Sequence, residues 1–336
     1  MRRRMAFGAT LAAFALVFAS APTAASAADE PCVVTACTVT FTPALDQQSW
    51  VVPDDIVELS AIVAGAAGVG NRSASGGPGG VVVVALNSSL AGSQLHLLVG
   101  AVGQGSQAPT SARPQGGGGT YLATSDTFLV VSGGGGGAGN WVQFGLPESP
   151  SESVFLEGEV SGGTGGAAAG GTDGSYALVA TSPGRGATPT AAGLPGEGYS
   201  DTYRGTAGTA ATVTSGVITP GLGGAAGFTS GAGGGWYFGG GGGSNPASTN
   251  DADGLVTAEY GSGGGGSGYL APSLVAASTA TNTGEGFVTL EYRLAADEPE
   301  LADTGSADAA GIILVSGLLL TTGTALMMRR SRRATA

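Results

Sequence analysis

The chain has 336 residues, of which 65 are glycine and 16 are proline, and only 11% are charged. Its 24 acidic residues outnumber 12 basic residues, all of them arginine, so the formal net charge is −12. A surface of this sign repels nucleic acid. The absence of lysine excludes a P-loop, whose motif ends in Gly-Lys, and a protein kinase, which needs a strand lysine.

The N-terminus has the pattern of a secretory signal peptide. Arginines at positions 2 to 4 precede an apolar run, and small residues, Ala25 and Ala27, occupy the two positions that a signal peptidase reads. We predict that cleavage between Ala27 and Ala28 removes residues 1–27 and that the rest of the chain is exported.

The only two cysteines, Cys32 and Cys37, lie five positions apart near the start of the expected mature chain. Exported cysteines usually pair, so we predict a disulfide that closes a short loop and contributes modestly to stability. Free thiols and a metal-binding pair are the alternatives, and the lack of a nearby histidine disfavours a metal.

The glycine content of the middle of the chain borders on low complexity, and a disordered wall-spanning spacer is one interpretation. However, valine-rich segments recur between the glycine blocks, and disordered chains are poor in such residues. We predict strands at 37–42, 56–63, 80–86, 94–100, 128–132, 255–260 and 287–294.

The last of these segments alternates most clearly, with Val288, Leu290, Tyr292 and Leu294 on one face and polar residues on the other. This is the pattern of a half-buried antiparallel strand. No amphipathic helix is indicated outside the two apolar ends of the chain. The sequence therefore predicts an all-β fold, with a signal segment at one end and a membrane helix at the other.

Motifs for chemistry are few. Gly134-x-Gly136-x-x-Gly139 matches a dinucleotide-binding fingerprint in letters, but the residues that follow do not favour the helix that this motif requires. His96 is the only histidine and lies in a predicted strand, and no nucleophile elbow accompanies it. We therefore predict no catalytic residues and no cofactor.

Two further patterns leave alternatives open. Asp251-x-Asp253-Gly254 lacks the third acid and the spacing of an EF-hand, so a weak calcium site in a loop is all that it suggests. Trp141 and the aromatic residues 236–238 flank glycine runs. They are interpreted as lids on glycine faces, or as exposed aromatic side chains that bind a glycan or a protein.

The C-terminus combines three parts. The pentapeptide Leu301-Ala302-Asp303-Thr304-Gly305 is followed by an uncharged apolar stretch, 309–328, and by an arginine-rich tail, 329–336. About 20 apolar residues span the hydrocarbon core of a bilayer. Arginines after the span favour retention of the tail on the cytoplasmic side.

This order of parts resembles the C-terminal sorting signal of Gram-positive surface proteins, in the Leu-Ala-x-Thr-Gly form found with many actinobacterial sortases. The resemblance implies that sortase cuts between Thr304 and Gly305 through an acyl-enzyme intermediate and links Thr304 to peptidoglycan. Sortase and peptidoglycan are then partners, and the membrane holds the chain only before sorting. The alternative is a single-span membrane protein that sortase does not process.

Removal of both ends would change the charge balance. Asp308 and seven arginines fall in the removed ends, so residues 28–304 keep 23 acidic residues against five arginines, a net charge near −18. Such a chain is soluble and attracts cations weakly.

The glycine blocks carry a second resemblance. Gly76-Gly77-Pro78-Gly79-Gly80, the runs at 116–119 and 133–137, and the later runs at 233–243 and 263–268 follow strands in the order seen in the extracellular glycine-rich domain of anaplastic lymphoma kinase-type receptors and in related bacterial surface proteins. It implies a β-sandwich with polyglycine helices of the polyproline II type packed side by side. It does not imply kinase activity, because the kinase of those receptors is a separate domain.

The N-terminal pattern and the two resemblances together predict four parts: a signal peptide, a glycine-rich β ectodomain, an acidic linker and a sorting signal, at 1–27, 28–293, 294–300 and 301–336. We expect a non-enzymatic, wall-anchored surface protein that acts as a coat component, an adhesin, or a module for an unidentified glycan or protein ligand. A wall-associated hydrolase is the alternative, although neither paired acids nor a histidine constellation supports it.

Overall fold

The computed structural model describes residues 36–70, 75–103, 114–145, 155–176, 182–198, 204–227, 230–235, 237–244, 249–250 and 255–295, and for part of the strands only the backbone. The chain divides into two compact units, Met1–Leu294 and Ala295–Ala336. The expected signal peptide, pentapeptide, membrane span and basic tail all lie outside the described residues.

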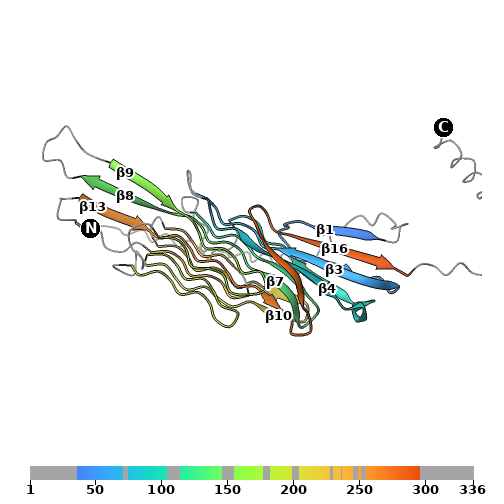
Figure 1. Ribbon diagram of the computed structural model, residues 1–336. Coiled ribbons are helices and arrows are strands. Elements are labelled where there is room, and N and C mark those ends of the chain that lie inside the picture. The colour runs from blue at the N-terminus through green and yellow to red at the C-terminus, as the bar shows by residue number, and fades with distance from the viewer. Residues whose placement is uncertain are drawn as a thin grey trace, which may run out of the picture. The chain divides into compact units, whose positions relative to one another are not determined.

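The first of two five-stranded antiparallel sheets has the order β1-β16-β3-β4-β15. Figure 1 shows β1, β16, β3 and β4 side by side in this order. The strands are β1 (Cys37–Phe41), β3 (Ile56–Ala64), β4 (Gly79–Leu86), β15 (Ala276–Asn282) and β16 (Phe287–Leu294).

The second five-stranded sheet has the order β14-β7-β6-β5-β2. Its members are β2 (Gln48–Val51), β5 (Gln94–Leu98), β6 (Thr120–Ala123), β7 (Phe128–Ser132) and β14 (Tyr269–Leu270).

The two sheets face each other across one hydrophobic core. Alternate residues of β3, β4, β5 and β16 enter this core, as the period of a β-strand requires. Leu59, Val84 and Leu290 come from the first sheet, and Leu97 and Leu122 from the second. Leu97, Leu122 and Leu290 are fully buried. The expected alternation of the last strand is confirmed at Val288 and Leu290, which are buried.

The all-β prediction is confirmed for the described residues, whose only helix is a single 3-10 turn, η1 (Ser88–Leu90). Each of the seven predicted strands is present, within two residues at either end. The remaining strands were not predicted. They include β6 and the exposed edge strand β15, whose sequence is rich in alanine, serine and threonine.

Two smaller sheets complete the first unit. One has the order β12-β13-β8-β9. Its strands are β8 (Gly139–Gly145), β9 (Phe155–Val160), β12 (Thr249–Asn250) and β13 (Leu255–Tyr260). The other is a hairpin of β10 (Thr212–Thr214) and β11 (Val217–Thr219). Ser215 and Gly216 form its turn with φ values of 49° and 77°, the left-handed backbone that two-residue hairpin turns require.

The remaining chain forms what we call the glycine bundle, a set of extended segments that run side by side (Figure 1). Its segments are 65–69, 76–80, 114–119, 133–138, 161–166, 170–174, 182–187, 193–196, 205–208, 222–227, 230–235, 239–244 and 261–268. Strands hold both ends of the inner segments: 133–138 joins β7 to β8, and 261–268 joins β13 to β14.

Segment 133–138 shows how the bundle is organised. Its amides donate in turn to segments 161–166, 230–235 and 65–69, and the same order repeats after three residues. Its carbonyls accept from three other segments, 76–80, 261–268 and 114–119. A central segment is thus hydrogen-bonded to neighbours all around it, whereas a β-strand is paired on two sides.

The same arrangement recurs at 239–244 and at 261–268. Gly239 and Gly242 donate to one neighbouring segment through the carbonyls of Thr209 and Thr206, at distances of 2.9 Å each. In both segments, amides that are three residues apart again donate to the same neighbouring segment. The bundle is therefore a three-dimensional lattice of backbone hydrogen bonds.

Close approach explains why the segments consist of glycine. An added Cβ at Gly135 would lie closer than 3.0 Å to the carbonyl oxygen of Gly77, and one at Gly263 would be equally close to that of Ala232. In each case the obstructing atom is backbone, which cannot rotate aside. The lattice thus depends on the missing side chains, not on left-handed backbone angles.

Candidate functional site

Hydroxyl side chains stand where glycine segments meet strands. Thr120 Oγ1 donates to Ala64 O at 2.7 Å and accepts from Gly100 N at 3.2 Å, and Ser132 Oγ donates to Gly80 O at 2.6 Å. Thr120 and Ser132 are fully buried. Buried hydroxyls are tolerated when they are hydrogen-bonded, so these two groups link the two large sheets to each other where the glycine segments begin.

Deeper in the bundle, serine hydroxyls link neighbouring segments of the chain to one another. Ser244 ends a glycine run, accepts from Gly205 N at 2.7 Å and donates to Gly196 O. Ser262 Oγ donates to Ser175 O at 2.9 Å. Neither serine was predicted from the sequence to have a role. The available signal was the recurrence of serine at the borders of glycine runs.

The residues of the dinucleotide fingerprint lie in the bundle. Gly134 and Gly136 belong to the central segment, where all residues are buried, and Gly139 begins strand β8. A strand in this place agrees with the expectation that no helix follows. A phosphate would have to displace the neighbouring segments to reach these amides.

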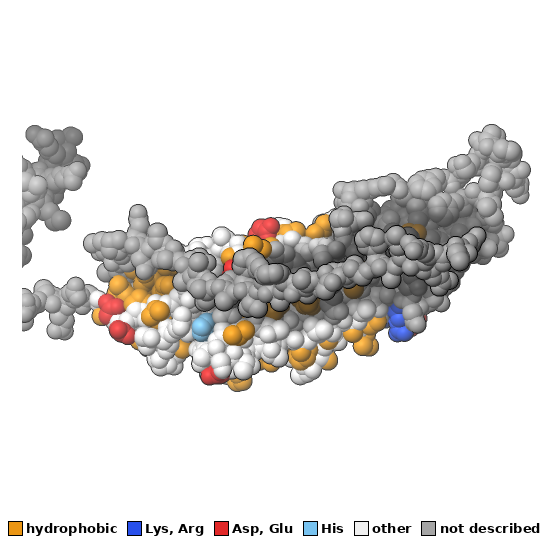
Figure 2. All heavy atoms as spheres, turned by 180° about the vertical axis from the view of Figure 1, so that it is seen from behind, with side chains coloured by type: hydrophobic (Ala, Val, Ile, Leu, Met, Phe, Trp, Pro, Cys, Tyr) orange, Lys and Arg blue, Asp and Glu red, His pale blue; other side chains and the backbone are white. Residues whose placement is uncertain are grey.

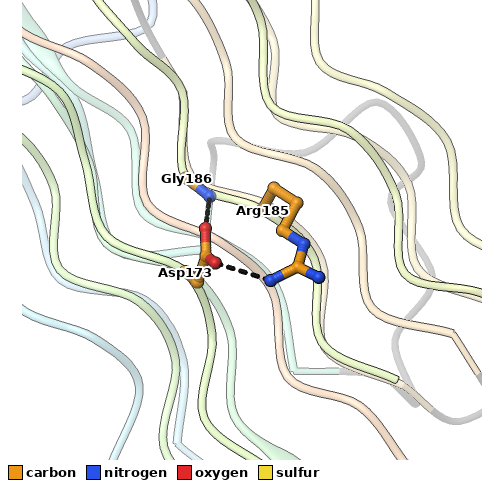
Figure 3. Close-up of polar contacts among 3 residues, drawn as sticks. All are labelled: Asp173, Arg185 and Gly186. Carbon is orange, nitrogen blue, oxygen red and sulfur yellow. Dashed lines mark hydrogen bonds and ion pairs between the residues drawn. The ribbon is translucent and has the colours of Figure 1, made fainter. Parts of the chain in front are cut away.

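An acidic side chain takes part in the bundle near Arg185. Asp173 Oδ1 accepts from Gly186 N, and Asp173 Oδ2 from Arg185 Nη1, each at 2.8 Å (Figure 3). Both side chains are about half exposed, at 50% and 51%. The carboxylate therefore substitutes for a carbonyl acceptor at the margin of the bundle, and its ion pair is too exposed to contribute much.

An aromatic cluster covers the outer face of the second sheet. The rings of Tyr121 and Phe128 lie 5.2 Å apart, Phe128 meets Tyr237 edge to face, and Tyr237 stacks on Tyr269 at 4.5 Å. Tyr237, expected to be a lid on glycine or an exposed binding residue, is half-buried against other aromatic rings. Trp236 and the side chain of Trp141 lie outside the described residues.

Tyr121 is the most strongly perturbed titratable group of this cluster. Burial raises the pKa of its hydroxyl well above the ordinary value, and a hydrogen bond with the backbone of Gly221 acts in the opposite direction. Burial also raises the pKa of Tyr237, with the charge of Tyr269 as a second cause. The phenol of Tyr121 is thus kept neutral inside the fold.

His96 helps to hold the β10–β11 hairpin. Gln47 Nε2 lies 3.1 Å from His96 Nδ1 and donates to Gly216 O, while Gln47 Oε1 accepts from Ile218 N at 2.9 Å. These contacts give the only histidine a structural environment, and no serine hydroxyl is hydrogen-bonded to it among the described residues.

Other predicted site residues lie partly or wholly outside the described residues. Cys37 is disulfide-bonded, whereas Cys32 is not described. The residues at 25, 27 and 28, the pentapeptide 301–305 and the calcium candidate 251–254 are not described either. Where the structure describes the chain, no group of three or more metal-ligating side chains is found, and no helix is long and apolar enough to cross a membrane.

Charged side chains are sparse on the described surface. In Figure 2, the described part of the face shown is mostly white, the colour of backbone and uncharged polar side chains, with scattered hydrophobic side chains and few charged ones. The chain matches no family model and no curated protein.

Proposed function

We propose that the protein is a non-enzymatic surface protein that sortase links to peptidoglycan through Thr304. The order of pentapeptide, apolar span and arginine tail carries this proposal. The apolar span holds the chain at the membrane until a sortase thiolate attacks the Thr304 carbonyl. The protein then belongs to the cell wall of a Gram-positive actinobacterium, and the membrane is only a stage in its export.

The fold supports a mechanical or ligand-presenting role. We assign the glycine segments to the polyproline II type, because such a helix has three residues per turn and their hydrogen bonds return after three residues. Together with the facing sheets, they match what is implied by the resemblance to the glycine-rich domain of the receptors named above. A domain ordered by backbone contacts makes a rigid coat component or a support for a glycan or protein ligand.

The domain should act close to its attachment point. Thr304 follows Leu294 by ten residues, which reach at most about 35 Å when extended. This length suits a coat component in or just above the wall better than a far-reaching adhesin. The strongly negative mature chain disfavours nucleic acid as a partner.

Mass spectrometry of purified walls tests the attachment. After muramidase digestion, we expect the C-terminal peptide to end at Thr304 and to carry a peptidoglycan fragment as an added mass. A Thr304→Ala variant is the matched control and should be absent from the purified wall fraction. A dominant peptide that continues through Gly305 would refute sorting and favour the single-span membrane protein.

A further inference from the structure

An open cavity of about 710 Å³ lies at one end of the first sheet. Its lining comes from β1, β3, β4 and β16 and includes Thr38, Glu58, Ser60, Glu291 and Arg293. The volume is within the range of small-molecule sites, about 300–1,000 Å³. The cavity contains none of the residues that were predicted as functional apart from Cys37.

Strand register brings the polar residues of the cavity together. Glu291 of β16 pairs with Thr38 on one side and with Ser60 on the other, and Arg293 pairs with Glu58. Residues paired across antiparallel strands lie on the same face of the sheet. The carboxylates and the guanidinium are therefore neighbours, with two hydroxyls beside them.

The charges in the cavity are not balanced. Arg293 Nη2 donates to Glu58 Oε1, with side-chain exposures of 49% and 66%. Arginine has five N–H donors, so this pair leaves donors for a second acceptor. The carboxylate of Glu291 forms no ion pair within the described part of the chain. The three groups thus sum to one negative charge.

We propose that this cavity binds a free diamino monocarboxylic acid, such as lysine. One ammonium lies against Glu291, the second against Glu58, and the carboxylate shares Arg293. The ligand has one net positive charge, which balances the one net negative charge of the cavity. Because the chain contains no lysine, no lysine ammonium of its own or of a second copy competes for the two carboxylates.

Ligand-observed NMR on the full-length protein tests this site with L-lysine as the probe. We expect saturable, weak binding, because the groups are half exposed. Cadaverine lacks the carboxylate and norleucine lacks the second ammonium, so each should bind about two- to fivefold more weakly. Equal affinities for lysine and cadaverine would mean that the acidic protein attracts any cation, and this result would overturn the proposal.

Variants locate the binding. Glu291→Gln should weaken lysine binding by about two- to fivefold while leaving the fold unchanged, because the side chain has no ion pair to lose among the described residues. Arg293→Gln should weaken it similarly, with circular dichroism as the check on folding. Asp46→Asn removes an exposed charge outside the cavity and should change nothing. Unchanged affinity in Glu291→Gln, or no saturable binding, contradicts the site and leaves wall attachment untouched.

Discussion

The two large sheets and the glycine bundle consist of extended chain, but different forces order them. The sheets bury Leu97, Leu122 and other apolar side chains, so removal of hydrocarbon from water stabilises them. The bundle has almost no side chains to bury, and its segments meet through backbone hydrogen bonds in several directions. Ordering glycine carries a larger entropic cost than ordering other residues.

The sheets and the bundle contribute to the stability of the fold in different ways. Each backbone hydrogen bond contributes only about 1 kcal/mol net, which is comparable with the cost of ordering one residue. Segments such as 133–138 and 261–268 are therefore stable because strands hold both of their ends. The hydrophobic core fixes the ends, and the lattice of hydrogen bonds makes the part between them rigid.

The largest expected effect is that of a side chain added inside the bundle. Gly135→Ala places a Cβ against the Gly77 backbone, and we expect a loss of more than about 4 kcal/mol of unfolding free energy, or failure to fold. Gly284→Ala is the control, because the nearest atom to its Cβ is 3.8 Å away. It should change stability by less than about 1 kcal/mol. Similar urea midpoints for the two variants would contradict close packing.

Truncation of a side chain in the core of the sheets should lower the unfolding free energy less than Gly135→Ala does. Leu97 is fully buried, so Leu97→Ala should lower the unfolding free energy by about 2–5 kcal/mol through lost burial and a cavity. Leu45, which is 96% exposed, serves as the control, and Leu45→Ala should lie within about 0.5 kcal/mol of the parent. Thermal melts compare them. A tolerated Leu97→Ala would mean that the bundle, not the core, fixes the strands.

High pH should weaken the aromatic cluster. The folded state keeps Tyr121 protonated because burial raises its pKa, whereas the unfolded chain ionises near the ordinary value of about 10. This contribution is therefore present below pH 10 and lost as pH rises, by up to about 1.4 kcal/mol per pH unit. Tyr121→Phe should remove that slope in urea titrations, and the exposed Tyr176→Phe should not. Identical slopes in both variants would contradict burial of the phenol.

The smallest loss of stability is expected for substitutions of Asp173 at the margin of the bundle. Asp173→Asn removes the ion pair with Arg185 but keeps an oxygen for Gly186 N, so stability should fall by about 0.5 kcal/mol or less. Asp173→Ala loses both contacts and should fall further, by about 1 kcal/mol. Urea unfolding measures the difference. Equal losses in the two variants would assign the effect to charge alone.

Apolar patterning predicted the strands that build the hydrophobic core. Alternation in 287–294 marked β16 because one face of that strand is buried. The same signal missed β15, since an edge strand of alanine, serine and threonine buries little. Pattern alone also could not separate β8 from loop, because its Gly139 continues a glycine run.

The sequence did not predict which segments of the bundle lie side by side. The resemblance implied glycine helices side by side, but identical residues carry no information about which segments become neighbours. Burial with a period of three is visible where other residues interrupt the glycines: Gly205 is buried and Gly208 half-buried, whereas Thr206 and Thr209 are exposed. The serine and threonine clamps were missed because a hydroxyl at the end of a glycine run also resembles an ordinary turn.

Native-state hydrogen exchange most directly tests the claim that the bundle is one ordered lattice. The amides of Gly134, Gly241 and Gly264 donate to carbonyls at 2.7–3.0 Å deep in the bundle. By NMR they should exchange as slowly as core amides of β3 and β5, which open only by global unfolding. Exchange near unfolded-chain rates at these glycines, with the strand amides still protected, would contradict the lattice.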